Sequence, residues 1–175
     1  MFNNQAIQPK FLYHASQNRN IKILKPRAKS IRSSDEGPVV FASPDKAYAS
    51  MFLVPSDDCW TSKGQFDGWY YQAISEEERY RKLDKGGAIY TFKSNTFKSD
   101  PTRGMREKEW ISKEPVKPVK KEIYESGLDA MMQLGVKVVF ISPAVFSRFR
   151  QMLRRGLIKE AFKLIFSPDL TSNLL

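Results

Sequence analysis

The residue types available for chemistry limit what this 175-residue chain can do. His14 is its only histidine and Cys59 its only cysteine. A single cysteine excludes an internal disulfide and leaves no cysteine cluster for a structural zinc site. A single histidine argues strongly against histidine-rich metal sites, and only weakly against a Ser-His-Asp enzyme. We therefore expect no bound metal, and chemistry that uses carboxylates, hydroxyl groups and one imidazole.

A predicted strand that leads directly into a helix positions one of these hydroxyl groups. Residues 39–42 form a short apolar run, which predicts a buried strand. Ser43 and Pro44 then suit an N-cap and a first helical residue. Tyr48 would lie one turn into this helix, at the carboxyl end of the strand, where open sheets commonly present ligand-facing groups. The alternative is that Tyr48 is an ordinary core residue.

Three short patches stand in an order typical of a known enzyme family. They are Tyr13-His14-Ala15-Ser16, then Phe41-Ala42-Ser43 with Tyr48, and finally Glu109-Trp110-Ile111. Together they resemble the His–Tyr–Glu signature of NAD-dependent ADP-ribosyltransferases, the group that contains poly-ADP-ribose polymerases and diphtheria-type toxins. In that family a first strand carries Tyr-His-Gly-Ser/Thr, a later strand runs into the helix with the Tyr, and a final strand opens with Glu and an aromatic residue. The resemblance covers Phe11 to about Val119.

The resemblance implies roles for the matching residues, with NAD as the substrate. His14 would hydrogen-bond a ribose hydroxyl of NAD, and Tyr48 would stack on the nicotinamide ring. Glu109 would bind the 2′-hydroxyl of the nicotinamide ribose, where a carboxylate stabilises the oxocarbenium-like cation that forms when the nicotinamide bond breaks. Ser16 and Ser43, which complete the first two patches, would belong to the NAD site. For His14 the alternative is a partly buried histidine that hydrogen-bonds the backbone.

Two further residues are candidates near these patches. Trp60 would supply a second aromatic face for the nicotinamide, as in many of the resembling enzymes; alternatively, it packs beneath its own loop. Glu107 and Glu109 look like the Glu-x-Glu of another branch of the family, in which the first Glu helps to choose the acceptor. On a strand these two residues would share one face, so either could reach the site. The alternative for the pair is a solvated edge strand.

Basic residues accumulate toward the end of the chain. Lys and Arg number 29 against 19 Asp and Glu, which gives a formal charge of +10. From residue 143 onward the chain carries a predicted amphipathic helix, and its Arg148, Arg154 and Arg155 are candidates for binding a polyanion. A solvated surface, a phosphate ligand and an anionic membrane surface are the alternatives for this charge.

The order of predicted elements indicates an α+β fold with short strands, interspersed helices and no internal repeat. The length fits one compact domain across residues 1–175, with a core at 11–142 and a basic helical extension at 143–175. The resemblance implies a split, mainly antiparallel sheet. Strands are predicted at 11–15, 69–72, 88–92, 108–112 and 136–141, helices at 123–135, 143–155 and 157–165, a polar loop at 56–68, and either a short helix or an excursion at 76–85.

The resemblance predicts an enzyme that transfers ADP-ribose from NAD to a macromolecular acceptor, protein or nucleic acid, and releases nicotinamide. An RNA 2′-phosphotransferase-like enzyme of similar fold is one alternative, although its chemistry depends on several arginines. A non-catalytic basic nucleic-acid-binding module is another. No apolar stretch reaches the roughly 18 residues that a membrane helix needs, and residues 1–10 lack the apolar core of a signal peptide. We therefore expect a cytoplasmic protein, or an effector delivered into a host cell.

Overall fold

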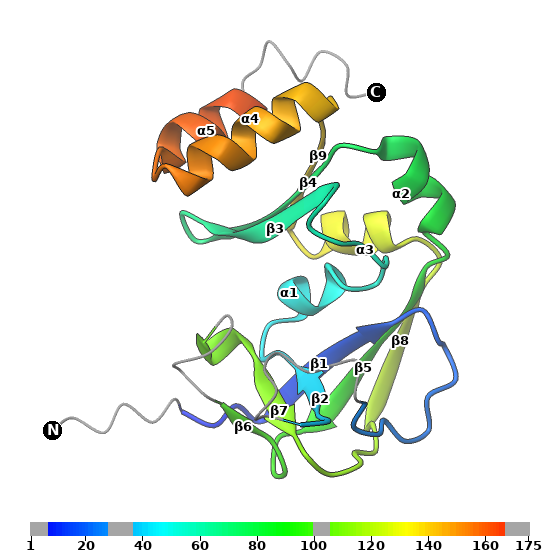
Figure 1. Cartoon of the computed structure of the whole chain (residues 1–175). Helices are drawn as coiled ribbons and strands as arrows, with labels where there is room; N and C mark the ends of the chain where they lie inside the picture. The colour runs from blue at the N-terminus through cyan, green and yellow to red at the C-terminus, as the bar shows by residue number, and fades with distance from the viewer. Residues whose placement is uncertain (1–6, 28–36, 100–105, 167–175) are drawn as a thin grey trace, which may run out of the picture.

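The computed structural model describes residues 7–27, 37–99 and 106–166, whose strands form three small sheets (Figure 1). The first is antiparallel and joins β1 (Phe11–Ser16), β5 (Gly87–Lys93) and β8 (Lys120–Tyr124). The second, also antiparallel, joins β2 (Val40–Ala42), β7 (Trp110–Ser112) and β6 (Lys98–Ser99). The third joins β3 (Thr61–Phe66) and β4 (Trp69–Ile74) in a hairpin, with β9 (Lys137–Phe140) parallel to β4.

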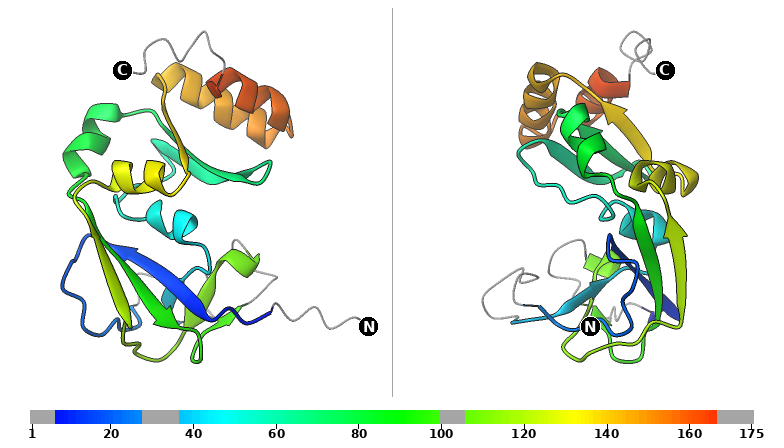
Figure 2. Two further views of the ribbon diagram at one scale, coloured as in Figure 1. Left: turned by 180° about the vertical axis from the view of Figure 1, so that it is seen from behind. Right: turned by 90° about the vertical axis from the view of Figure 1, so that its right-hand side faces the viewer.

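The helices separate and cover these sheets, as the two views in Figure 2 show. Two short helices, α1 (Lys46–Ser50) and α3 (Gly127–Gln133), lie between the first and third sheets. At the end of the chain, α4 (Pro143–Arg154) and α5 (Ile158–Phe166) pack together on the far side of the third sheet. The remaining helical segments are α2 (Glu77–Leu83) and the 3-10 turn η2 (Arg106–Lys108). This arrangement confirms the predicted α+β fold, its mainly antiparallel sheets and its C-terminal helical segment.

Alternation along β4 explains why the third sheet is buried on both faces. Tyr70 and Ile74 point toward α1 and α3, whereas Tyr71 and Ala73 point toward α4 and α5. Each of these four side chains is at most 6% exposed. The two sides of one strand therefore serve two separate apolar clusters.

The polar loop predicted at residues 56–68 is wrong, because Thr61–Phe66 is strand β3. Asp67 and Gly68 make the turn into β4 with φ angles of 47° and 81°. An Asp-Gly pair with two positive φ values fits the tight hairpin turns that follow the natural twist of two strands. The polar composition of β3 suits its place at the edge of its sheet, where one side remains available to solvent.

Two predicted helix starts are also wrong. Asp45, and not Ser43, is the N-cap of α1, because its Oδ1 accepts hydrogen bonds from the backbone N–H of Ala47 at 2.9 Å and of Tyr48 at 3.4 Å. Ile123 belongs to strand β8, and α3 begins only after its N-cap Ser126. Both errors arose where a polar residue just beyond the expected boundary makes the better cap.

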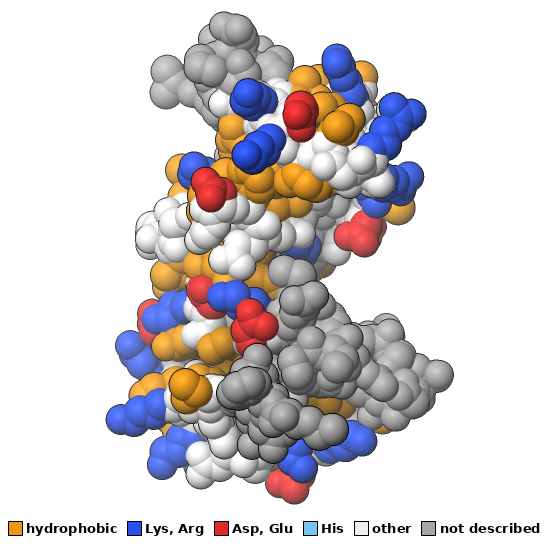
Figure 3. Space-filling view, turned by 90° about the vertical axis from the view of Figure 1, so that its left-hand side faces the viewer, with side chains coloured by type: hydrophobic (Ala, Val, Ile, Leu, Met, Phe, Trp, Pro, Cys, Tyr) orange, Lys and Arg blue, Asp and Glu red, His pale blue; other side chains and the backbone are white. Residues whose placement is uncertain are grey.

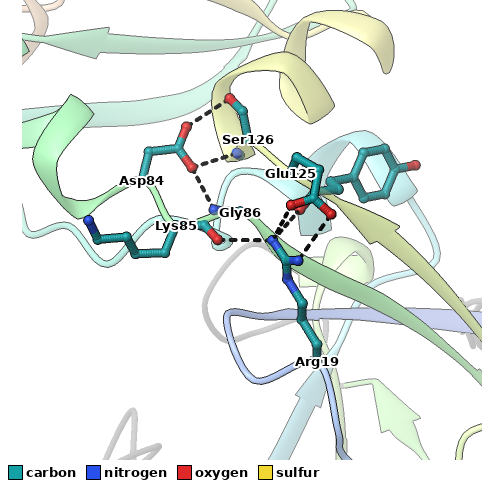
Figure 4. Close-up of polar contacts among 8 residues, drawn as sticks. Arg19, Asp84, Lys85, Gly86, Glu125 and Ser126 are labelled. Carbon is teal, nitrogen blue, oxygen red and sulfur yellow. Dashed lines mark hydrogen bonds and ion pairs between the residues drawn. The ribbon is translucent and has the colours of Figure 1, made fainter.

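A carboxylate junction ties α2 to the start of α3 (Figure 4). Asp84 accepts hydrogen bonds from Ser126 Oγ at 2.9 Å, from the backbone N–H of Gly127 at 2.6 Å and of Leu128 at 3.0 Å, and from Gly86 N–H at 3.0 Å. Burial opposes ionisation of Asp84, but these hydrogen bonds outweigh burial and hold its pKa below the usual value. The junction fixes the connection that leads from α2 into β5.

Contacts of Arg19 and the conformation of Gly86 complete the same junction. The guanidinium of Arg19 binds both carboxylate oxygens of Glu125 at 3.0 Å and donates to the Lys85 carbonyl oxygen at 3.2 Å. Gly86 has a φ of +61°, and a β-carbon there would clash with backbone oxygens of the β8 end. Only glycine therefore fits this turn without strain.

Candidate functional site

The three sequence patches meet where the first two sheets touch. Tyr13 in β1 and Ser43, just after β2, exchange backbone hydrogen bonds of 2.7 and 2.8 Å. On its other side β2 pairs with β7, where Ala42 lies opposite Trp110. Glu109 directly precedes β7, so this pairing brings it beside the chain that leads into α1. Residues about 100 positions apart in the sequence therefore reach one place in the fold.

A side-chain hydrogen bond joins two of the candidate residues. The Tyr48 hydroxyl donates to Glu109 Oε1 at 2.9 Å. Asp45 caps the helix that carries Tyr48 and so fixes the direction in which the ring points. A carboxylate held by a buried tyrosine has a defined orientation, which a catalytic carboxylate requires.

A pocket of about 310 Å³ opens at this hydrogen bond. Its volume lies at the lower end of the range for small-molecule sites. Its walls are mostly apolar and aromatic, and the lining residues are Tyr13, His14, Ala15, Phe41, Ala42, Ser43, Tyr48, Ala49, Phe52 and Glu109. The structure thus brings His14, Ser43, Tyr48 and Glu109 together around one pocket.

The surroundings of His14 favour its neutral form. Burial lowers its pKa, a hydrogen bond to the Phe41 carbonyl opposes this effect, and the nearby charge of Arg27 lowers the pKa further. The Phe41 oxygen lies 2.8 Å from Nδ1 and can only accept, so Nδ1 carries the proton. In the neutral ring Nε2 is consequently an acceptor.

Phe52 is a pocket residue that the sequence reasoning missed as a site residue. It follows Tyr48 by four positions, and the two rings meet edge to face with centroids 5.3 Å apart. Phe52 is 46% exposed although it is large and apolar. The signal in the sequence was this helical spacing, because residues four apart on a helix share a face. Phe52 therefore adds a partly exposed aromatic ring to the pocket wall.

Three other candidates lie outside the pocket. Trp60 is 1% exposed and packs in the core against Tyr80, with ring centroids 6.2 Å apart. Ser16 does not line the pocket, and its Oγ accepts from Asn18 N–H at 3.2 Å. Glu107 is exposed in η2, while Glu109 lies between η2 and β7. The expected strand with both glutamates on one face is therefore wrong, because the chain turns before the strand begins.

Two lysines contact aromatic residues of the pocket wall from outside. Lys46 lies 5.2 Å from the centroid of Tyr13 and pairs with Glu122 at 2.9 Å. Lys63 of β3 lies 4.4 Å from the centroid of Phe52 and donates to Met51 O at 3.3 Å and Ser56 Oγ at 3.2 Å. Burial lowers the pKa of Lys63, and the charge of Asp58 opposes this shift. Lys63 thus places an ammonium group beside the pocket wall, whereas the charge of Lys46 is balanced by Glu122.

The predicted polyanion residues lie elsewhere. Arg148 and Arg154 are exposed on α4 and line a separate surface depression of about 510 Å³, and Arg155 is the exposed C-cap of the same helix. The third sheet separates α4 from α1, so these arginines and the Tyr48–Glu109 pocket occupy different sides of that sheet.

Within residues 7–27, 37–99 and 106–166, no cluster of three or more His, Cys, Asp or Glu side chains is arranged to hold a metal ion. None of the helices in these ranges combines the length and the apolar character that crossing a membrane demands. Comparisons of the chain with protein-family models, with curated proteins and with solved structures gave no match.

Proposed function

We propose that this protein is an NAD-dependent mono-ADP-ribosyltransferase that uses the pocket at Tyr48 and Glu109. The observation that carries the proposal is the hydrogen bond of 2.9 Å between these two residues in a pocket that His14 also lines. The three patches that resemble the His–Tyr–Glu signature meet around this pocket, although they lie far apart in the sequence. Roles on a single NAD molecule require such a convergence.

Each residue has a part in the reaction that follows from its contacts. Neutral His14 accepts a hydrogen bond from a ribose hydroxyl at Nε2, because Nδ1 is engaged by the Phe41 carbonyl. Tyr48 and Phe52 provide aromatic walls for the nicotinamide, and stacking orients the ring that departs. Glu109, oriented by the Tyr48 hydroxyl, stabilises the positive charge that develops on the ribose as the bond to nicotinamide breaks.

The remaining charged residues suit supporting parts. Glu107 is exposed in η2, two residues before Glu109 of the pocket wall, and we assign it to the acceptor and not to cleavage of NAD. Lys63 lies behind the Phe52 wall, where its charge favours the anionic pyrophosphate of NAD, whereas the charge of Lys46 is balanced by Glu122. Among the described lining residues there is no arginine, and an RNA 2′-phosphotransferase would depend on several. The transferase therefore has the better support of the two.

Incubation with NAD labelled in the adenosine part tests the proposal. Nicotinamide release would demonstrate cleavage, and label on protein or nucleic acid would demonstrate transfer. As an independent readout of binding, NAD at a hundred times its dissociation constant should add about 2.7 kcal/mol to the free energy of unfolding. A purified, folded protein that neither releases nicotinamide nor gains stability with NAD would refute the proposal, and a purely structural nucleic-acid-binding module would then remain.

A further inference from the structure

A groove lined by aromatic residues lies on the side of the third sheet away from the NAD pocket. It has a volume of about 750 Å³ and includes Phe66 and Trp69 from the β3–β4 hairpin, together with Phe162 and Phe166 from α5. The rings of Phe66 and Phe162 are stacked, with centroids 3.9 Å apart and planes at 8°. Phe162 and Phe166 are also parallel, with planes at 3°. The groove thus contains a row of parallel rings.

The two ends of this row are accessible, and its middle is not. Phe162 is 5% exposed, whereas Phe66 and Phe166 are each partly exposed. Trp69 meets Phe166 edge to face at 88° and closes one side of the row. A flat aromatic ligand could therefore continue the stack at Phe66 or at Phe166 without unpacking the core.

Positive charge surrounds the row of rings. Lys159 and Lys163 line the groove, and the ammonium of Lys137 lies 4.0 Å from the centroid of Trp69. Asp67 is the one acidic residue among the described lining residues, and none of the three lysines forms an ion pair within the described part of the chain. Figure 3 shows Lys and Arg side chains, with acidic side chains among them, around an apolar area at the end of the molecule that carries α4 and α5. Net positive charge therefore borders an aromatic surface.

Flat rings beside several ammonium groups match the bases and phosphates of single-stranded nucleic acid. In single-stranded nucleic acid the bases are free to stack on aromatic side chains, and the phosphates beside them meet lysines. A duplex keeps its bases stacked within the helix and could use only the charge. An acidic peptide or an anionic membrane surface would likewise use the lysines but would gain nothing from a row of parallel rings.

The hairpin that forms the groove also borders the NAD pocket. On β4, Trp69 faces the groove, while the adjacent Tyr70 faces the other way and lies 5.7 Å from Tyr48, centroid to centroid. On β3, Phe66 lines the groove, and Lys63 contacts Phe52 of the pocket. The β3–β4 hairpin, at the edge of its sheet, therefore lines the groove and also contacts aromatic residues of the pocket.

We propose that this groove binds single-stranded nucleic acid and that the bound strand is the acceptor of ADP-ribose. The binding stands on the groove itself; the acceptor role rests on the proposed function. In the transfer, a nitrogen or oxygen of the strand forms a bond to the anomeric carbon of the ribose. The bond to nicotinamide breaks, nicotinamide leaves as a neutral base with the bonding electrons, and the proton of the nucleophile passes to water.

The test measures binding of a fluorescent single-stranded oligonucleotide of about 12 nucleotides, within the usual range of site sizes, as a function of salt. The double variant Lys159→Gln/Lys163→Gln should reduce the slope of log affinity against log salt by about 1.4, at about 0.7 for each lost phosphate contact. Phe66→Leu keeps the apolar volume but loses the ring face, and should weaken binding by about 5- to 100-fold with an unchanged slope. The matched charge control, Lys22→Gln/Lys25→Gln, changes two exposed lysines of the same chain and should leave both quantities unchanged.

Three results would overturn the binding proposal. They are a duplex that binds as tightly as the single strand, a Phe66→Leu variant that is folded and binds normally, and a control pair that loses as much affinity as the groove pair. The acceptor role is measured separately, from the label that the wild type transfers to the oligonucleotide and from its nicotinamide release without oligonucleotide. Nicotinamide release with no label on a bound strand would overturn the acceptor role and leave the proposed function standing. Tight, ring-dependent binding by a protein that neither releases nicotinamide nor gains stability with NAD would instead refute the proposed function.

Discussion

Two carboxylates in this protein, Asp84 and Glu109, illustrate opposite uses of the same chemical group. Asp84 accepts four hydrogen bonds of 2.6 to 3.0 Å, three of them from backbone N–H groups, at a junction between helices. Glu109 stands at the wall of a pocket and accepts from the hydroxyl of an aromatic residue that lines the same pocket. Asp84, surrounded by backbone donors, holds the chain, whereas Glu109, in the wall of a pocket, is the carboxylate that we propose acts on a ligand.

The largest expected effect concerns the junction. Asp84→Ala would leave the N–H groups of Gly86, Gly127 and Leu128 without their partner, so it should lower the free energy of unfolding by about 2–4 kcal/mol, as measured by urea denaturation. Asp129→Ala, an exposed change in the first turn of α3, is the matched control and should cost less than about 1 kcal/mol. Equal losses in the two variants would contradict the structural part assigned to Asp84.

The pH dependence of stability sharpens the same point. The pKa of Asp84 is lowered in the folded state, so its contribution is fully present above the unfolded value of 3.8 and is lost as the pH falls through the lower folded value. Below about pH 4, the free energy of unfolding should therefore fall more steeply with decreasing pH in the wild type than in Asp84→Ala. If the free energy of unfolding fell equally steeply in acid in both proteins, ionisation of Asp84 would not be linked to folding.

Variants of Tyr48 test the role of Glu109, because the Tyr48 hydroxyl donates a hydrogen bond to that carboxylate. Tyr48→Phe removes the hydrogen bond that orients Glu109 but keeps the ring, and should lower kcat about 5- to 10-fold with little change in KM for NAD. Tyr48→Ala also removes the aromatic wall and should raise KM in addition. If the Phe variant matched the wild type in kcat, orientation of Glu109 by the hydroxyl would not matter to the reaction.

Substitution of His14 should have a smaller effect on kcat/KM for NAD, and this effect should depend on pH. Its pKa is lowered, chiefly by burial, so the neutral acceptor form prevails at neutral pH and protonation sets in only below the usual value of 6.5. The wild-type kcat/KM for NAD should therefore fall as the pH decreases below about 6.5. His14→Asn, which retains a donor toward the Phe41 carbonyl, should show a lower kcat/KM and lack this acid limb. An acid limb that persists in the variant would assign the titration to another group.

The smallest effect is expected on the helical surface. Changing Arg148, Arg154 and Arg155 together to Gln should alter the free energy of unfolding by only about ±0.5 kcal/mol for each position, because all three are exposed. Nicotinamide release without acceptor should stay at the wild-type rate, since the third sheet separates these residues from the pocket. A folded triple variant that loses NAD cleavage would show that α4 belongs to the site after all.

The elements that sequence patterns predicted well are those in which the apolar period is strong. Residues 136–141 and 143–155 correspond closely to β9 and α4, because a continuous apolar run and a regular helical stripe have few competing solutions. Strand β3 was missed since Thr61, Lys63 and Gly64 carry no apolar alternation, and the pairing with β4 decides its conformation. Strand β8 was missed for the same reason, as its Lys-rich sequence lies at a sheet edge.

The residues of the candidate site also differ in how far the sequence alone could place them. The resemblance, which rests on the order of three short patches, was what singled out His14, Tyr48 and Glu109, and the structure places all three around one pocket. Trp60 could not be placed from its type alone, because a tryptophan in a loop suits a core and a pocket equally well, and tertiary packing determines which it joins. The groove at Phe66 and Phe162 was not predictable, because it depends on how α5 docks on a hairpin that the sequence did not reveal.

The most direct measurement of the central claim is the rate of nicotinamide release by Glu109→Gln beside that of Glu107→Gln. These two changes remove the same charge two residues apart, one inside the pocket wall and one exposed outside it. We predict that Glu109→Gln lowers the rate by about 100-fold or more, which corresponds to about 2.7 kcal/mol of transition-state stabilisation, while its stability and NAD-induced thermal shift remain close to the wild type. Glu107→Gln should release nicotinamide at nearly the wild-type rate. A Glu109→Gln variant that is as active as the wild type, or a Glu107→Gln variant that is equally impaired, would contradict the assignment of Glu109 as the carboxylate that drives cleavage of NAD.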